Sequence, residues 1–108
     1  MRVDVVTLFP ELFEPFLSVA FVGKAVKDGT LAVRLRSPRD FGLGRHKSVD
    51  DTPYGGGSGM VMRVDVLAAC IESLVADAPD GVVPHRVLLT PQGARLDQSR
   101  VRALASRP

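Results

Sequence analysis

Three short apolar segments of the sequence predict β-strands. Residues 3–8 form a β-branched apolar run, which is typical of a strand buried on both faces. Residues 31–36 alternate apolar and polar side chains, so a strand in this segment would place Arg34 and Arg36 together on one side. Residues 86–89 are a third apolar-rich run of strand length.

Helical patterns occupy the segments that separate and follow these strands. A short helical piece is expected at residues 11–14, between two prolines, and a longer helix at residues 19–28, which Gly29 would end with a left-handed backbone. Residues 64–76 repeat apolar side chains on one helical face, and residues 97–105 predict a last helix. The alternation of strands and helices predicts an α/β fold with a parallel sheet, right-handed crossovers and flanking helices.

The segments after the second and third predicted strands are expected to meet at one edge of this sheet. Residues 37–62 show no sustained period and are rich in proline and glycine, so we expect a long irregular loop. Thr90-Pro91-Gln92-Gly93 ends the third predicted strand. Because open parallel sheets bind ligands beyond the carboxyl ends of their strands, we expect both loops to converge on one binding edge.

Length and composition favour one small domain, residues 1–108, because 108 residues are too few for a second core. The longest apolar runs are far shorter than the ~20 residues of a membrane helix, and no secretory signal is recognisable, so we expect a cytoplasmic protein without membrane contact. The single Cys70 is expected to be a buried thiol. The alternation calls for another strand after Pro108, which predicts a further C-terminal part or a partner that completes the sheet.

Positive charge is concentrated in one part of the chain, although the net charge is only +2. Five basic residues fall within fourteen positions that contain one acid, Asp40: Arg34, Arg36, Arg39, Arg45 and Lys47. Such a cluster favours a phosphate-bearing partner such as nucleic acid. A solvated strand face followed by a charged loop explains the same pattern and remains an alternative.

The segment from residue 45 to 62, RHKSVDDTPYGGGSGMVM, is the most distinctive of the sequence. Four of residues 55–59 are glycine, which is costly in backbone entropy unless the chain needs unusual dihedral angles or close approach by another molecule. A phosphate-binding loop is excluded because Gly59 is followed by Met60 rather than by lysine and a hydroxyl residue. A dinucleotide fingerprint is excluded because these glycines do not follow the first strand.

A base-binding pocket is the chemistry that this segment favours. Backbone groups of residues 55–59 can bind a purine edge, Tyr54 can stack, and Asp50 or Asp51 can accept hydrogen bonds from guanine. No metal site is predicted, since His46 is the only nearby imidazole and the two adjacent carboxylates point to different sides of an extended chain. A flexible loop whose aspartates cap local turns is the alternative.

Five segments spread over the chain resemble a known family. They are VVTLFPELF at residues 5–13, GKAVKDG at 23–29, SPRDF at 37–41, RHKSVDDTPYGGGSGMVM at 45–62 and LTPQG at 89–93. In these segments the chain resembles the N-terminal part of the bacterial tRNA (guanine-N1)-methyltransferase (TrmD) family. The resemblance implies the N-terminal portion of a trefoil-knot (SPOUT-like) methyltransferase domain, with the knot itself missing from this chain.

The resemblance also implies an activity. It is methyl transfer from S-adenosylmethionine to N1 of the guanosine immediately 3′ of the anticodon in tRNA. The residues expected to bind the substrate are His46, Asp50, Gly59, Tyr54 and Arg45. Those expected to bind S-adenosylmethionine are Leu88, Leu89, Thr90 and Pro91.

Other parts of the family pattern are not found in this chain. Its Cys-Gly-Arg-Tyr-Glu-Gly-Ile-Asp segment, its Ser-Ile-Gly-Asp-Tyr loop and its general-base aspartate have no counterpart in residues 1–108, so no catalytic residue is assigned and the isolated chain is expected to be inactive. Ser58 stands where family members often carry proline. The resemblance implies a homodimer with an active site shared between subunits, tRNA as partner and Mg²⁺ as an optional aid. A non-catalytic tRNA-binding or dimerisation fragment is the alternative.

Overall fold

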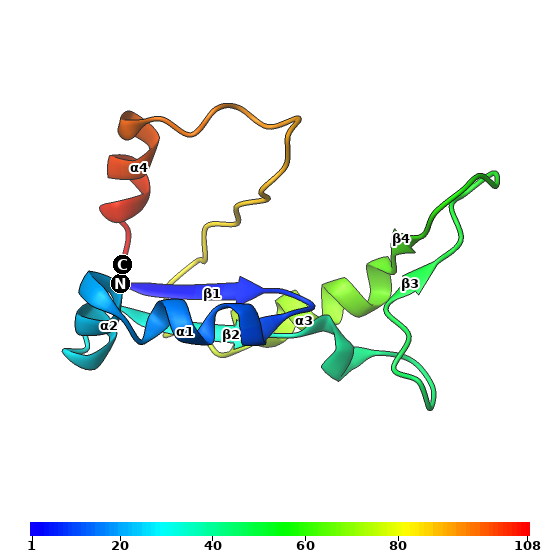
Figure 1. Ribbon diagram of the computed structural model, residues 1–108, viewed down its shortest axis with the longest axis horizontal. Coiled ribbons are helices and arrows are strands. Elements are labelled where there is room, and N and C mark those ends of the chain that lie inside the picture. Colours follow the sequence, from blue (N-terminus) through cyan, green and yellow to red (C-terminus); the bar gives the residue numbers. More distant parts are fainter.

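The computed structural model describes residues 1–108 and is built around a two-stranded parallel sheet. Strand β1 (Arg2–Val6) pairs with strand β2 (Ala32–Arg36), and Val3 lies opposite Val33 in the register. Both strands fall where the apolar runs predict them. The chain ends lie side by side in Figure 1, and the backbone N–H of Arg2 donates to the carbonyl of Pro108 at 2.9 Å.

Short helices connect the two strands, as parallel pairing requires. A 3-10 turn η1 (Pro10–Leu12) leads into α1 (Glu14–Leu17) and α2 (Ala20–Lys27). Gly29 follows with φ +77°, the left-handed conformation expected of a residue that ends a helix. The helix predicted at residues 19–28 is thus confirmed to within one residue at each end. The short helical piece predicted at residues 11–14 is replaced by η1 and α1, and α1 continues through Pro15, which the first turn of a helix tolerates.

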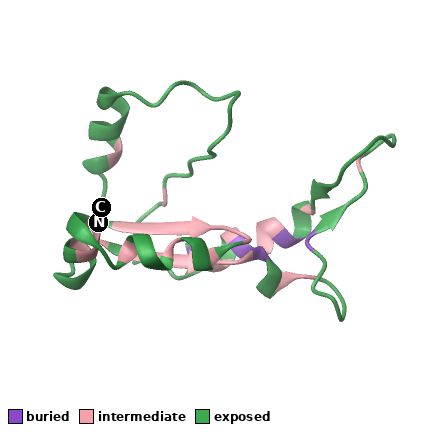
Figure 2. Ribbon diagram, viewed as in Figure 1, coloured by how far each residue is buried: buried purple, intermediate pink, exposed green.

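Helix α3 (Val64–Ala76) carries most of the small core, and its bounds match the predicted ones. Val66, Cys70 and Leu74 recur every four residues on one face and are 2%, 0% and 5% exposed. This buried face appears in Figure 2 beside η2 (Pro38–Phe41), whose Pro38 is also buried. Burial raises the pKa of the Cys70 thiol, so the prediction of a buried thiol is confirmed.

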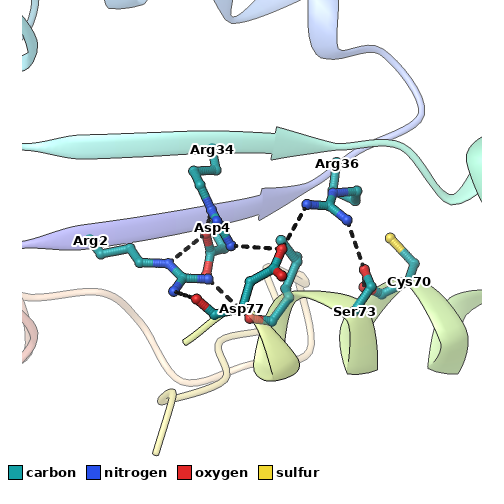
Figure 3. Close-up of polar contacts among 8 residues, drawn as sticks. Arg2, Asp4, Arg34, Arg36, Cys70, Ser73 and Asp77 are labelled. Carbon is teal, nitrogen blue, oxygen red and sulfur yellow. Dashed lines mark hydrogen bonds and ion pairs between the residues drawn. The ribbon is translucent and has the colours of Figure 1, made fainter. Parts of the chain in front are cut away.

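An ion-pair network fastens the end of α3 to the sheet. Asp4 on β1 pairs with Arg2 at 2.7 Å and with Arg34 on β2 at 3.1 Å. The Arg2 guanidinium also donates to the carbonyl oxygens of Leu74 and Asp77, at 3.0 and 2.6 Å, and so caps the end of α3. Figure 3 shows these side chains filling the space between the two strands and the helix.

The connection from β2 to α3 is more ordered than its sequence pattern predicts. It contains η2, an isolated bridge between Leu43 and Ser48, and an antiparallel hairpin of β3 (Asp50–Asp51) and β4 (Val61–Met62). The expectation of an irregular loop over residues 37–62 is therefore wrong in part. Strands of two residues are too short to produce a periodic pattern, which explains why the sequence does not reveal them.

The third predicted strand, residues 86–89, is not formed. Leu88 and Leu89 are 84% and 88% exposed, and the backbone groups of residues 83–89 make no hydrogen bonds. A strand needs a partner, and no element of the structure pairs with this segment. It belongs to a long arc, drawn from yellow to orange in Figure 1, that leads away from the sheet to α4 (Gln98–Ala105).

The final helix α4 is confirmed at its predicted position. The Asp97 carboxylate accepts a hydrogen bond from the backbone N–H of Arg100 at 2.9 Å and thereby caps the helix. No helix of the structure combines the length and the apolar content that crossing a membrane requires.

Candidate functional site

The glycine-rich segment forms the loop of the β3–β4 hairpin, which leads directly into α3. Strand β4 leads through Arg63 directly into α3, and the backbone N–H of Arg63 donates to the carbonyl of Val49 at 2.8 Å. Val49, just before β3, is itself buried. Both strands of the hairpin are therefore anchored at their base, while the loop between them projects away from the rest of the molecule in Figure 1.

The glycines of this loop have backbone conformations that other residues rarely adopt. The φ angles of Gly55, Gly56, Gly57 and Gly59 are +79°, +83°, +117° and +90°. No atom lies within 4 Å of the position that a Cβ would take at any of the four. The glycines are thus required by backbone conformation, and they leave the loop backbone open to solvent.

A tight turn next to the hairpin presents three polar side chains. Leu43 and Ser48 exchange two backbone hydrogen bonds of 3.1 and 2.9 Å, which close residues 43–48 into a turn. Lys47 has φ +51°, a strained value for a residue with a side chain. Gly42 lies so close to Lys47 that a Cβ would overlap the Lys47 carbonyl. The turn leaves Arg45, His46 and Lys47 exposed.

A hollow of about 380 Å³ lies between this turn and the hairpin. Its polar lining consists of Arg39, His46, Lys47, Ser48 and Asp50. Its apolar lining consists of Leu8, Val49, Met60, Val61 and Met62. The structure thus brings two of the predicted substrate residues, His46 and Asp50, to one cavity, with two cationic side chains beside them.

A second hollow, of about 420 Å³, is lined by Asp51 and the fully exposed Tyr54. Arg63 in its wall pairs with Asp65 at 3.0 Å and with Asp51 at 3.6 Å. The hydrogen bond from Arg63 holds the pKa of Asp65 below its usual value. The two adjacent aspartates of β3 therefore face different hollows, as an extended chain predicts.

The remaining predicted site residues lie apart from the first hollow. Gly59 and Arg45 line neither cavity, although each is next in sequence to a residue that lines the first. Leu88, Leu89, Thr90 and Pro91 also line neither, so the expected convergence of the two loops on one edge is not found within this chain. The reason is the missing third strand, which would have carried Thr90 to the sheet edge.

Two residues of the first hollow lie outside the segment 45–62 in which the base-binding site was predicted. Arg39 was noticed only as part of the basic cluster, and its place in η2, after the Ser37 hydroxyl that accepts its backbone N–H, brings it to the cavity. Leu8 follows β1, and nothing in its sequence context indicates a site. Only the tertiary structure unites them with His46.

The chain on its own offers little to hold a cofactor or a metal ion. Residues 88–91 have backbone groups free to bind a ligand edge, and the Gly93 N–H bonds to the Thr90 carbonyl at 3.1 Å, but these residues enclose no cavity. They do not form a complete S-adenosylmethionine site. No group of three or more His, Cys, Asp or Glu side chains is arranged to hold a metal ion, so a Mg²⁺ site is not recognisable either.

Comparisons with known proteins agree on one family. The family model described as tRNA (Guanine-1)-methyltransferase TrmD matches residues 1–108. A tRNA (guanine-N(1)-)-methyltransferase of Sorangium cellulosum is 56% identical over 126 residues, covering 100% of this chain and 48% of the relative. The enzyme of the same name from Geobacter metallireducens is 48% identical over 106 residues, covering 97% of this chain and 42% of the relative.

A solved structure is similar over nearly the whole chain. The crystal structure of tRNA (m1G37) methyltransferase from Aquifex aeolicus superposes with a TM-score of 0.85 at 28% identity, over 99% of this chain and 47% of that one. The chain therefore spans about half the length of the relatives that it matches.

Proposed function

Because this chain belongs to the tRNA (guanine-1)-methyltransferase TrmD family, we propose that the protein methylates N1 of the guanosine immediately 3′ of the anticodon in tRNA, with this chain as its N-terminal half. The observation that supports the proposal most is the hollow shared by His46 and Asp50 beside the open glycine loop. Such a cavity offers both a charged acceptor and backbone groups to the edge of a base.

Asp50 is the residue that recognises guanine. Guanine presents donors at N1 and at its exocyclic amino group, and the Asp50 carboxylate, which makes no ion pair, is free to accept from them. Adenine has an acceptor at N1, so a carboxylate discriminates against it. His46 lies across the same hollow and orients the base.

The glycine loop and Tyr54 provide the rest of the base contacts. The backbone of residues 55–59 is open to a ligand on the side where a Cβ would stand, so its N–H and carbonyl groups can approach a purine edge. Tyr54 is fully exposed at the start of this loop, in the second hollow, and can stack on a neighbouring base of the anticodon stem–loop. Both features favour a base that is unstacked from its neighbours.

The methyl donor is S-adenosylmethionine, which supplies an already activated electrophilic methyl group. Residues 88–91 contribute backbone contacts to its site, which is completed outside these 108 residues. The proton on guanine N1 must leave as the methyl group arrives, and a positioned general base would accelerate that step by about 10²–10⁴-fold. No residue of this chain is assigned as the general base, because the proposal gives Asp50 the recognition of guanine.

The active site is shared between two copies of the protein, which acts in the cytoplasm on tRNA. The hollow and residues 88–91 do not meet within one chain, which agrees with a donor site and a base site drawn from different subunits. Mixing two variants of reduced activity, Asp50→Asn and Leu89→Asp, tests this arrangement. A mixture more active than either variant alone supports a shared site, and a mixture of folded dimers no more active than the variants contradicts it.

The activity itself is tested with S-adenosylmethionine labelled in its methyl group and an unmodified tRNA transcript. The intact protein is expected to produce labelled 1-methylguanosine, identified by mass spectrometry of the digested RNA. A protein that binds tRNA with or without S-adenosylmethionine, and never transfers the methyl group, would instead be a non-catalytic tRNA-binding module.

A further inference from the structure

The five clustered basic residues divide into two groups in the structure. Arg34 pairs with Asp4 at 3.1 Å and with Asp77 at 3.3 Å, and Arg36 pairs with Asp77 at 3.1 Å. The Arg36 guanidinium also donates to the Ser73 hydroxyl at 3.1 Å. Figure 3 shows both arginines turned towards the end of α3. Their charges are thus compensated within the fold.

Arg39, Arg45 and Lys47 differ from this pair in their contacts and in their exposure. None of their side chains forms an ion pair or a hydrogen bond, and all three residues are exposed. Arg39 and Lys47 line the hollow that contains His46, and Arg45 precedes His46 in the turn. The only carboxylate in that lining is Asp50. Three uncompensated positive charges therefore surround one negative charge at the site.

The turn of residues 43–48 fixes the backbone that carries Arg45 and Lys47. Two backbone hydrogen bonds between Leu43 and Ser48 close it, and the left-handed backbone of Lys47 reverses the chain just before Ser48. A strained residue persists only where the surrounding structure determines it, and such residues concentrate at binding sites. The fixed turn reduces the backbone entropy that is lost when its side chains bind an anion.

We propose that Arg39, Arg45 and Lys47 form a binding site for the RNA phosphates that flank the target base, while Arg34 and Arg36 take no part in RNA binding. The proposal rests on the proposed function, in that tRNA is the RNA bound. The phosphate contacts place the nucleotide, and Asp50 reads its base. This division separates contacts that determine affinity from the contact that determines specificity.

Salt dependence of tRNA binding tests the proposal. Each phosphate contact contributes about 0.7 to the slope of log K against log salt concentration for single-stranded nucleic acid, so the triple variant Arg39→Gln, Arg45→Gln, Lys47→Asn should lower the slope by about 2. Asparagine is chosen at position 47 because it tolerates the left-handed backbone. The loss of affinity should be the same for tRNA with guanosine and with adenosine at the target position.

The control removes two exposed positive charges elsewhere on the surface, so any general effect of lost charge would appear in it at about two thirds of the size. Lys24 and Lys27 on α2 are exposed and make no ion pair, so Lys24→Gln, Lys27→Gln should leave the slope unchanged within error. Arg36→Gln should lower stability without lowering the slope, because its charge is already compensated. Circular dichroism establishes that each variant is folded.

The outcomes separate this proposal from the proposed function. An unchanged slope in the folded triple variant, or an equal decrease in the α2 variant, overturns the phosphate site while methyl transfer by the unmodified protein still stands. A decreased slope in a protein that never methylates tRNA supports the phosphate site and contradicts the enzymatic activity.

Discussion

Asp50 and Asp51 are adjacent in strand β3, but they line different hollows on the two sides of the hairpin. Asp51 is paired with Arg63 at 3.6 Å, and Arg63 is also held by Asp65. Asp50 forms no ion pair and shares its hollow with His46. The same side chain, at consecutive positions, therefore forms an ion pair at one position and is unpaired at the other, where the proposed function assigns it to ligand binding.

Substitution of the two aspartates should separate these contributions. Asp50→Asn removes the charged acceptor for guanine, and we expect kcat/KM for tRNA methylation to fall about 5- to 150-fold, as the loss of about 1–3 kcal/mol implies. Asp51→Asn loses only an exposed ion pair, so we expect kcat/KM to stay within about threefold of the original value. Equal losses in both variants would contradict the assignment of Asp50.

Gly42 is expected to control the shape of the turn that presents His46. A Cβ at this position would overlap the Lys47 carbonyl, so Gly42→Ala must distort the turn or break the Leu43–Ser48 bridge. Such overpacking lowers the free energy of unfolding by about 1–3 kcal/mol. We also expect kcat/KM for tRNA methylation to fall, because His46 in the distorted turn is displaced. Gly44→Asn is the control, since no atom lies within 4 Å of its Cβ position and asparagine tolerates its φ of +72°. An unchanged kcat/KM in Gly42→Ala would show that methylation does not depend on the shape of this turn.

The ion-pair network around Asp4 should make the free energy of unfolding depend on pH in the acidic range. Partial burial alone would raise the pKa of Asp4, but hydrogen bonds from Arg2 and Arg34 outweigh it and hold the pKa below the ordinary value of 3.8. Because the pKa is lower in the folded state, the charged carboxylate contributes stability above about pH 4, and this contribution is lost as the pH falls through the folded-state value.

Asp4→Asn should therefore lower the free energy of unfolding by about 1–3 kcal/mol at neutral pH, measured by chemical denaturation. The difference between variant and original protein should shrink as the pH falls below about 4. Asp28→Asn, an exposed position without an ion pair, is the control and should change stability little at any pH. A difference that stays constant down to strongly acidic pH would contradict the role of the network.

The buried face of α3 should contribute most to the stability of the fold. Leu74 is 5% exposed, and Leu74→Ala should lower the free energy of unfolding by about 2–5 kcal/mol. Val64 lies on the same helix but is 81% exposed, so Val64→Ala should change stability by less than about 0.5 kcal/mol. Similar effects of the two substitutions would mean that this face of α3 is not the core.

Sequence patterns predicted the elements whose own side chains determine them. The bounds of helix α3 were predicted correctly from the helical spacing of its apolar side chains, Val64, Leu67, Ala68, Ile71, Leu74 and Val75. Its buried face was predicted only in part, because Leu74 is the one member of that set that is buried, together with Val66 and Cys70. Helix α4 was located from its apolar stripe. Residues 86–89 have a strand pattern but no partner, so a local preference was not enough to form a strand.

The candidate site was predicted only where its residues are close together in the sequence. His46 and Asp50 lie in one distinctive segment, and their approach needs only a turn and a short hairpin. Arg39 and Leu8 reach the hollow through η2 and the end of β1, contacts between distant parts of the chain that no local pattern encodes. The neutralisation of Arg34 and Arg36 likewise depends on Asp77, more than forty residues away.

Methylation of a matched pair of tRNA transcripts tests the central claim most directly. The transcripts differ only at the nucleotide 3′ of the anticodon, which is guanosine in one and adenosine in the other, and both are incubated with S-adenosylmethionine and the intact protein. We expect one methyl group per molecule on N1 of the guanosine and none on the adenosine transcript. Equal methylation of both transcripts, or tRNA binding without methyl transfer to either, would contradict the account.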